Sequence, residues 1–282
     1  MASSTQTSRP RAVFSTLGCP ELSLAEVFAL VRRHNLGGVE IRALEGRMDL
    51  PALFREQYGE PSELRKYAAR AGVEIVSLDS SFKLAGAPEG ARDELLAFAG
   101  WAEGIGAPFV RVFDGGAFAS PLPAEYLAEA VGSVRWWRAE REKRGWTVDI
   151  MVETHDALCT GANCRALWDA AGVEIPVLWD AHHTWRKAGE AVDVTWEALR
   201  GHVPHIHYKD SVGKPSARHP FTYVLPGEGE FPLGDLARVL RQDAYGGVLS
   251  LEWERQWHPY LAPVDEALGH PGQRAFLENA GA

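Results

Sequence analysis

The sequence predicts a single (β/α)8 barrel, in which eight parallel strands alternate with helices. Three observations support this fold class. The chain has 282 residues, close to the roughly 250 that such a barrel needs. Short apolar, β-branched runs alternate with longer helical segments from Arg11 onward. Several of the short runs are apolar at successive positions, which is typical of strands buried in a parallel sheet.

The expected elements follow in regular order along the chain. Strands are expected over 12–17, 38–42, 74–80, 109–113, 148–153, 177–180, 205–208 and 248–253. A first helix opens at Ser23, because Glu26 stands three residues later, as in a capping box. Further helices are expected over 62–71, 92–105, 124–144, 163–171, 194–202 and 233–242, with a final helical segment over 263–279.

The sequence offers no competing domain organisation. An open dinucleotide-binding sheet would need Gly-x-Gly-x-x-Gly after its first strand, whereas Leu17-Gly18-Cys19-Pro20 follows here. No low-complexity linker divides the chain. We therefore expect residues 12–282 to form one barrel domain and residues 1–11 to be a flexible N-terminal tail.

Composition excludes several classes of partner. The net charge is −9 and no dense Lys/Arg block stands out, which argues against nucleic acid. No apolar run approaches the ~20 residues of a membrane span. Cys19, Cys159 and Cys164 are odd in number and lack zinc-site spacing, so we expect reduced thiols in a cytoplasmic protein. A homo-oligomer remains open.

Acids and histidines gather at the carboxyl ends of four consecutive predicted strands, where barrels of this class hold their active sites. A carboxylate there is costly unless it is paired or bound to metal. Taking one side chain from each strand gives a four-ligand set of Glu153, Asp180, His207 and Glu252. Three carboxylates and one imidazole form an oxygen-rich site. Such a site favours one divalent ion, Mn²⁺ first, with Mg²⁺, Co²⁺ or Zn²⁺ as alternatives.

Each of the polar residues near these strand ends, taken alone, has two interpretations. It either takes part in the site or forms a structural ion pair. We expect only one of His205 and His207 to face the mouth, with His205 packed or behind the ligands. Glu40 is expected to pair with Arg42 or Arg111. Lys209 either stabilises an oxyanion or pairs with an acid such as Asp210.

The strand-end segments resemble the xylose isomerase-like TIM barrel superfamily, the sugar phosphate isomerase/epimerase family. The resemblance covers roughly residues 13–254. It is carried by Val39-Glu40-Ile41-Arg42, Val110-Arg111-Val112-Phe113, Glu153-Thr154-His155, Asp180-x-x-His183, His207-Tyr208-Lys209-Asp210, Pro226-Gly227-x-Gly229 and Leu251-Glu252.

The resemblance also implies roles for individual residues. It makes Glu153, Asp180, His207 and Glu252 the metal ligands and His183 a substrate contact. Arg218 is the nearest candidate for the arginine that grips substrate in the family, although its spacing is longer. From their positions, we add His155, Lys209 and the aromatic Trp179 as expected substrate contacts.

The predicted function is a metal-dependent isomerase or epimerase of a small sugar, keto-sugar or cyclitol, in which Glu153 and Glu252 exchange a proton through an enediolate. The alternative is a metal-dependent inosose or keto-sugar dehydratase, with His155 or Lys209 as the added general acid. An endonuclease IV-like DNA-repair enzyme is disfavoured because no histidine lies between His34 and His155. A non-catalytic sugar-binding barrel is also disfavoured, because Glu252 is present. Without a Gly-rich phosphate cradle, the sequence favours a neutral substrate.

Overall fold

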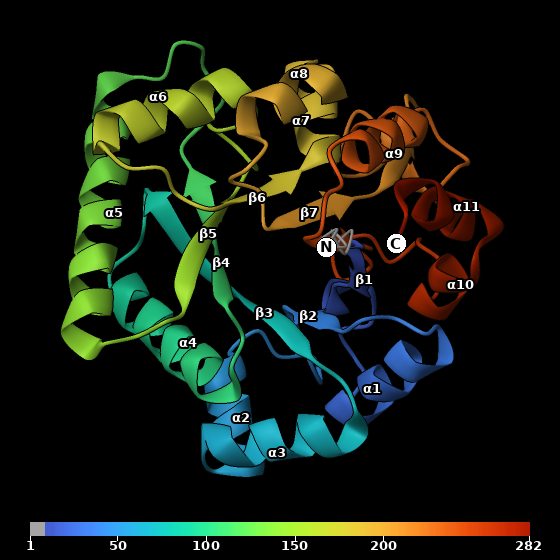
Figure 1. Ribbon diagram of the computed structural model, residues 1–282, viewed down its shortest axis with the longest axis horizontal. Coiled ribbons are helices and arrows are strands. Elements are labelled where there is room, and N and C mark those ends of the chain that lie inside the picture. The colour runs from blue at the N-terminus through green and yellow to red at the C-terminus, as the bar shows by residue number, and fades with distance from the viewer. Residues whose placement is uncertain (1–8) are drawn as a thin grey trace, which may run out of the picture.

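The computed structural model describes residues 9–282 as an eight-stranded barrel wrapped by helices (Figure 1). Most of the expected N-terminal tail, residues 1–8, lies outside the described residues. The first strand begins at Arg11, one residue earlier than expected. No helix within residues 9–282 is both long and apolar enough to cross a lipid bilayer.

The barrel strands are all parallel and pair in the order β1-β10-β7-β6-β5-β4-β3-β2. A parallel bridge between Ser15 and Glu40 joins the two outer members, β1 and β2, so the sheet closes on itself. The strands are β1 (Arg11–Phe14), β2 (Val39–Ile41), β3 (Ile75–Ala85), β4 (Phe109–Gly115), β5 (Asp149–Glu153), β6 (Val177–Asp180), β7 (His205–Tyr208) and β10 (Val248–Leu251). This architecture confirms the predicted (β/α)8 class.

Helices surround the barrel in Figure 1 and were largely expected. The first, after Ser23, has both hydrogen bonds of the predicted capping box. The helices are α1 (Leu24–Arg33), α2 (Leu50–Tyr58), α3 (Pro61–Ala71), α4 (Ala91–Ile105), α5 (Ala124–Arg144), α6 (Gly161–Ala171), α7 (Ala181–Ala188), α8 (Val192–Leu199), α9 (Leu233–Gln242), α10 (Val264–Gly269) and α11 (Pro271–Ala280).

Five features were not expected, and all but one lie beyond the strand ends. β3 and β4 continue together to Ala85 and Gly115, which pair. A two-stranded antiparallel hairpin, β8 (Asp210–Val212) and β9 (Thr222–Val224), follows β7. Helix α2 lies in the predicted long loop, and α7 begins directly after β6. The final helical segment is divided, because the region before Pro271 is extended.

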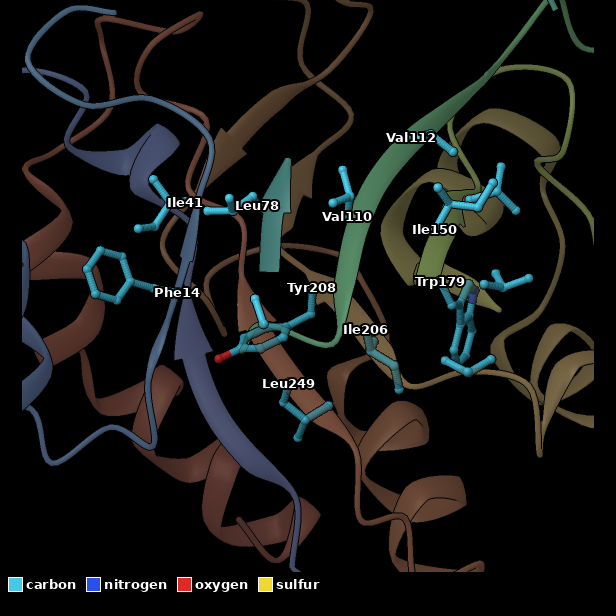
Figure 2. Close-up of a cluster of buried hydrophobic side chains, with 14 of the residues drawn as sticks. Phe14, Ile41, Leu78, Val110, Val112, Ile150, Trp179, Ile206, Tyr208 and Leu249 are labelled. Carbon is cyan, nitrogen blue, oxygen red and sulfur yellow. The ribbon is translucent and has the colours of Figure 1, made fainter. Parts of the chain in front are cut away.

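The apolar residues of the strands pack between the barrel and its helices. Trp179 on β6 stacks on Trp196 of α8, and Tyr208 on β7 contacts Phe276 of α11. Figure 2 shows both Trp179 and Tyr208 within a larger buried cluster that also includes Phe14, Ile41, Leu78, Val110, Val112, Ile150, Ile206 and Leu249. Because side chains alternate along a strand, the intervening positions point into the barrel.

Candidate metal centre and active site

The inward positions of the strands are unusually polar. Glu40, Asp79, Arg111, Glu153 and His207 are each at most 1% exposed. They come from β2, β3, β4, β5 and β7 and contact one another, although β2 and β7 are not adjacent in the sheet. Such contacts can form only through the barrel interior. The strands were expected to be apolar on both faces, but only their outer face is.

The four predicted ligand residues lie together at the carboxyl ends of β5, β6, β7 and β10. One donor atom from each of Glu153, Asp180, His207 and Glu252 can be chosen so that all lie within 4.8 Å of one another. His207 Nδ1 is 3.4 Å from Glu252 Oε2 and 3.8 Å from Glu153 Oε1. All four side chains are buried. A single ion can therefore contact all of them.

The donor atoms of this set fit a divalent ion. His207 Nε2 donates to Glu40 Oε2 at 2.8 Å, because a carboxylate can only accept. His207 Nδ1 is buried without any hydrogen-bond partner in residues 9–282. A buried polar atom without a partner is costly, and a bound cation would satisfy it. Ionised carboxylates and neutral imidazole are ligands that Mn²⁺ and Zn²⁺ accept.

His205 and His207 both contact Glu40, which corrects the expected pairing of Glu40. Residues two apart on a strand lie on the same face, so both rings point into the barrel, His205 behind His207. His205 Nε2 lies 2.6 Å from Glu40 Oε2, so Glu40 pairs with the histidines rather than with Arg42 or Arg111. Burial raises the pKa of the Glu40 carboxyl, but the two histidines outweigh burial and hold it well below its usual value.

Lys209 is a buried ammonium among carboxylates. Its Nζ is 2.6 Å from Asp180 Oδ2, 2.9 Å from Glu254 Oε1, and in contact with Glu252 Oε2. Burial lowers the pKa of Lys209, but the three carboxylates reverse that effect and raise it well above its usual value. Lys209 therefore neutralises part of the negative charge that the ligand set concentrates at the barrel mouth.

Asp210 does not pair with Lys209. Its carboxylate accepts backbone N–H groups of Gly227, Gly229 and Phe231 at 2.9–3.0 Å, and that of Ser211 at 2.8 Å. These bonds attach the loop after β9 to the end of β7. A Cβ at position 229 would collide with the Asp210 carboxylate, which explains the glycine there. Asp210 therefore positions the loop after β9. In the sequence, only its place in the family motif His207-Tyr208-Lys209-Asp210 drew attention to it.

His183 and His155 lie beside the ligand set. His183, on the first turn of α7, places Nδ1 3.0 Å from Asp180 Oδ2. The His155 ring packs edge-on against His183 and Phe113 and its side chain is 33% exposed. Burial lowers the pKa of His155, but Asp156 and Glu153 outweigh burial and raise it. Both histidines are therefore positioned to meet a molecule that enters the mouth.

Two other expected substrate contacts lie further from the ligand set. Trp179 is fully buried, donates to Thr184 Oγ1 at 3.0 Å and stacks on Trp196. It faces the helices because it precedes the inward Asp180, so the expectation that it contacts substrate is not met. Arg218 is exposed in the β8–β9 hairpin, where it donates to the Trp257 carbonyl.

The family model for xylose isomerase-like TIM barrels matches residues 28–277. The chain belongs to the xylose isomerase-like TIM barrel family. The resemblance inferred from the strand-end motifs is thus confirmed, and the family match includes every strand that carries a proposed ligand. No protein of curated function matches the chain by sequence.

Solved structures similar to this xylose isomerase-like barrel cover nearly the whole chain. The IolI protein with a bound zinc atom has 17% sequence identity and a TM-score of 0.72, covering 96% of this chain and 98% of its own. The probable 3-DHS dehydratase AsbF from Bacillus anthracis has 16% identity and a TM-score of 0.69, covering 96% and 97%. D-psicose 3-epimerase, solved in the presence of D-fructose, has 13% identity and a TM-score of 0.69, covering 96% and 100%. At these identities the likeness concerns the fold.

Proposed function

We propose that the protein is a divalent-metal-dependent isomerase or epimerase of a small sugar, keto-sugar or cyclitol. The observation that carries the proposal is the convergence of Glu153, Asp180, His207 and Glu252, with a buried His207 Nδ1 that has no hydrogen-bond partner in residues 9–282. Family membership supports a sugar-processing enzyme. A structural neighbour with bound zinc supports a metal site in this fold. We retain Mn²⁺ as the first candidate because three of four ligands are carboxylates.

The cation, when bound, would polarise the substrate's carbonyl group and so acidify the adjacent C–H. Glu153 is the proposed base. Burial raises its pKa, but Arg111, with Nε 3.2 Å from Oε2, outweighs burial and lowers it. The residue is therefore ionised at neutral pH and able to accept a proton. The other oxygen, Oε1, faces His207 Nδ1 and His183 Nδ1, each at 3.8 Å.

Glu252 and Lys209 complete the proposed proton transfer. Glu252 directly follows β10, three strands along the ring from β5, which carries Glu153. Burial raises the pKa of Glu252, but Lys209 and His207 outweigh burial and hold it well below its usual value. Glu252 is therefore ionised at rest, and it can return a proton to the substrate only after receiving one from the Lys209 ammonium that it contacts. The buried Lys209 ammonium offers positive charge to the oxyanion of an enediolate. His183 and His155 are proposed to bind substrate hydroxyls, and Arg218 to contact substrate from the rim.

A dehydratase is the second candidate, because the mouth also holds proton donors. Lys209 is cationic and buried beside Glu252, and the raised pKa of His155 favours its protonated ring. Either group can protonate a leaving β-hydroxyl after the same first proton abstraction. The distinction lies in the product: an isomer or epimer retains every oxygen of the substrate, whereas a dehydration product has lost one molecule of water.

Solvent-exchange experiments test the proposal. Purified protein is analysed for bound metal, reloaded with Mn²⁺, and incubated in D₂O with a panel of ketoses and inososes. We expect deuterium beside the carbonyl of at least one compound, and mass spectrometry then separates isomers from dehydrated products. Glu153→Gln should abolish exchange, whereas Glu56→Gln, an exposed control, should retain it. Exchange that persists in folded Glu153→Gln protein would remove Glu153 as the base.

The remaining proposals concern the surroundings of the protein. We propose a cytoplasmic location, since Cys19, Cys159 and Cys164 are all free and buried and reduced thiols persist in a reducing compartment. The polar mouth suits a small polyhydroxylated partner, with neither nucleic acid nor membrane required. A homo-oligomer stays a prediction, to be tested by light scattering.

A further inference from the structure

Arg42 is a buried cation at the barrel mouth that the proposed chemistry does not use. It follows β2 and is 5% exposed. Its guanidinium donates from Nη1 to the Asp79 carbonyl at 3.1 Å and from Nη2 to Ser81 Oγ at 2.9 Å. These two bonds leave most of its five N–H donors unused. No carboxylate of residues 9–282 forms an ion pair with it, whereas the adjacent Arg111 has Glu153 and Asp79.

A second guanidinium, that of Arg111, lies near Arg42 and adds positive charge. The guanidinium carbons of Arg42 and Arg111 lie 5.9 Å and 3.9 Å from the centre of the same ring, Phe113. Burial, and secondly the coulombic effect of Glu40, raise the pKa of Asp79 well above its usual value, which favours the neutral carboxyl. The carboxylates of Glu153 and Glu94 act on Arg42 from beyond ion-pair distance, and neither forms an ion pair with it.

A buried guanidinium without a counter-charge is costly, because its water shell is lost and no ion pair replaces it. Burial and then Arg111 lower the pKa of Arg42 to about 10, so the side chain is still charged at neutral pH. Ser81, the hydrogen-bond partner of Arg42, is exposed, so this wall can be reached from solvent. Arg42 therefore presents a positive charge, without a carboxylate partner in residues 9–282, at the entrance to the proposed active site.

We infer that Arg42, assisted by Ser81, forms a subsite for a carboxylate carried by the substrate. The planar guanidinium matches the two oxygens of a carboxylate. The substrate class is then a polyhydroxylated carbonyl acid rather than the neutral sugar that the sequence favoured. The inference rests on the proposed function only for the position of the reacting carbon. The anion subsite itself depends on Arg42 alone.

Equilibrium binding of two non-reacting probes tests the subsite without turnover. D-gluconate and D-glucitol differ only in a carboxylate replacing a hydroxymethyl group. Titration calorimetry is performed at constant ionic strength, first without added divalent metal and then with Mn²⁺. We expect wild-type protein to bind gluconate about tenfold to a hundredfold more tightly than glucitol, the range typical of a charge-assisted hydrogen bond.

Variants then assign the preference to one side chain. Arg42→Gln should remove it, Arg42→Lys should retain part of it, and Arg47→Gln should leave it intact. Arg47 is a suitable control because it pairs with exposed Glu56 outside the mouth. Circular dichroism checks that each variant is folded. If Arg42→Gln is unfolded, the subsite is tested by the gluconate preference of the wild-type protein and by its partial loss in Arg42→Lys.

Two results would overturn the inference: no preference for gluconate in wild-type protein, including no detectable binding, or an undiminished preference in folded Arg42→Gln protein. The metal titration separates this inference from the proposed function. If Mn²⁺ does not bind but the Arg42-dependent preference holds, the proposed function fails and the subsite stands. If Mn²⁺ binds and the preference is missing, only the subsite fails.

Discussion

Glu40 Oε2 accepts a hydrogen bond from His207 Nε2 at 2.8 Å, and the two residues are 167 positions apart in the chain. Both side chains are fully buried. Burial lowers the pKa of His207, but Glu40 and Glu252 outweigh burial and raise it well above its usual value, so the metal-free ring is protonated. A bound cation would displace the proton from Nδ1, which faces Glu153 and Glu252, and the bond to Glu40 would keep the remaining proton on Nε2. Partners of this kind orient metal-binding histidines and strengthen their binding.

Glu40→Gln should therefore weaken the binding of divalent metal by about tenfold to a hundredfold. The neutral amide is a weaker acceptor for the His207 N–H than the carboxylate is, and its NH₂ group is a donor that the two histidines cannot both satisfy. Calorimetric titration with Mn²⁺ measures the affinity, and urea unfolding checks the fold. Exposed Glu56→Gln is the matched control and should bind metal as the wild type does. An affinity within twofold of wild type in folded Glu40→Gln would contradict the role assigned to Glu40.

Lys209→Met should destabilise the metal-free protein by about 3 kcal/mol or more, because three buried or half-buried carboxylates lose their common cation. Mn²⁺ should restore much of the loss, since it supplies positive charge and binds only the folded state. Urea unfolding with and without Mn²⁺ measures both effects. Exposed Lys66→Met serves as the control. Equal stability of metal-free variant and wild type would show that Lys209 does not neutralise the ligand set.

Asp210→Ala should lower the free energy of unfolding by about 3 kcal/mol, because the N–H groups of Gly227, Gly229 and Phe231 lose their acceptor. The loop after β9 should also lose its protection from amide hydrogen exchange. Asp235→Ala, at an exposed position on α9, should cost less than about 1 kcal/mol. Unchanged exchange in the loop of Asp210→Ala would mean that other contacts hold it.

The thiols should be unreactive in the folded protein. Burial, and secondly Glu21, raise the pKa of Cys19 to about 12, and burial also raises the pKa values of Cys159 and Cys164. Because the thiolate is the reactive form, a disulfide reagent should react at about pH 8 at least about a hundredfold more slowly than in urea. Rapid labelling of native protein would show that one thiol is accessible.

Cys19 should also make stability depend on alkaline pH. Its pKa is raised in the folded state from an ordinary value of 9.0 to about 12, so the unfolded chain loses this proton first. The contribution of Cys19 is full below about pH 9 and is lost as the pH rises toward 12. Urea unfolding between about pH 8 and pH 10 should show stability falling with pH. Cys19→Ala should fall less steeply, and an equal slope would contradict the shift.

Much of the candidate site could be located from the sequence because parallel strands meet at one end. Glu153 and Asp180 end their strands, Glu252 directly follows β10, and His207 is the last residue but one of β7. Barrel closure places such ends around a common axis. Their roles as ligands remain predictions. Trp179 was misplaced because its position near the barrel mouth was considered without its phase: once Asp180 points inward, alternation along β6 turns Trp179 toward the helices.

Elements beyond the strand ends could not be located by periodicity. The β8–β9 hairpin has only three residues per strand and depends on the long-range bonds that Asp210 makes. Helix α7 is eight residues long and begins directly after Asp180, whose side chain caps it by accepting the His183 N–H. Asp180 thus both ends a strand and caps a helix. Because the sequence pattern assigned Asp180 to the strand, the helix that follows it was not predicted.

The amino-acid sequence by itself determined the order of strands and helices and the positions of the polar residues along each strand, because hydrophobic periodicity and capping act over a few residues. Only the tertiary structure decided which buried charge has which partner. Glu40 pairs with His207, Lys209 with Asp180, and Arg42 with no carboxylate of residues 9–282. The physical reason is that closure of the barrel sets distances between residues far apart in sequence, and Coulomb energies in a poorly hydrated interior depend on those distances.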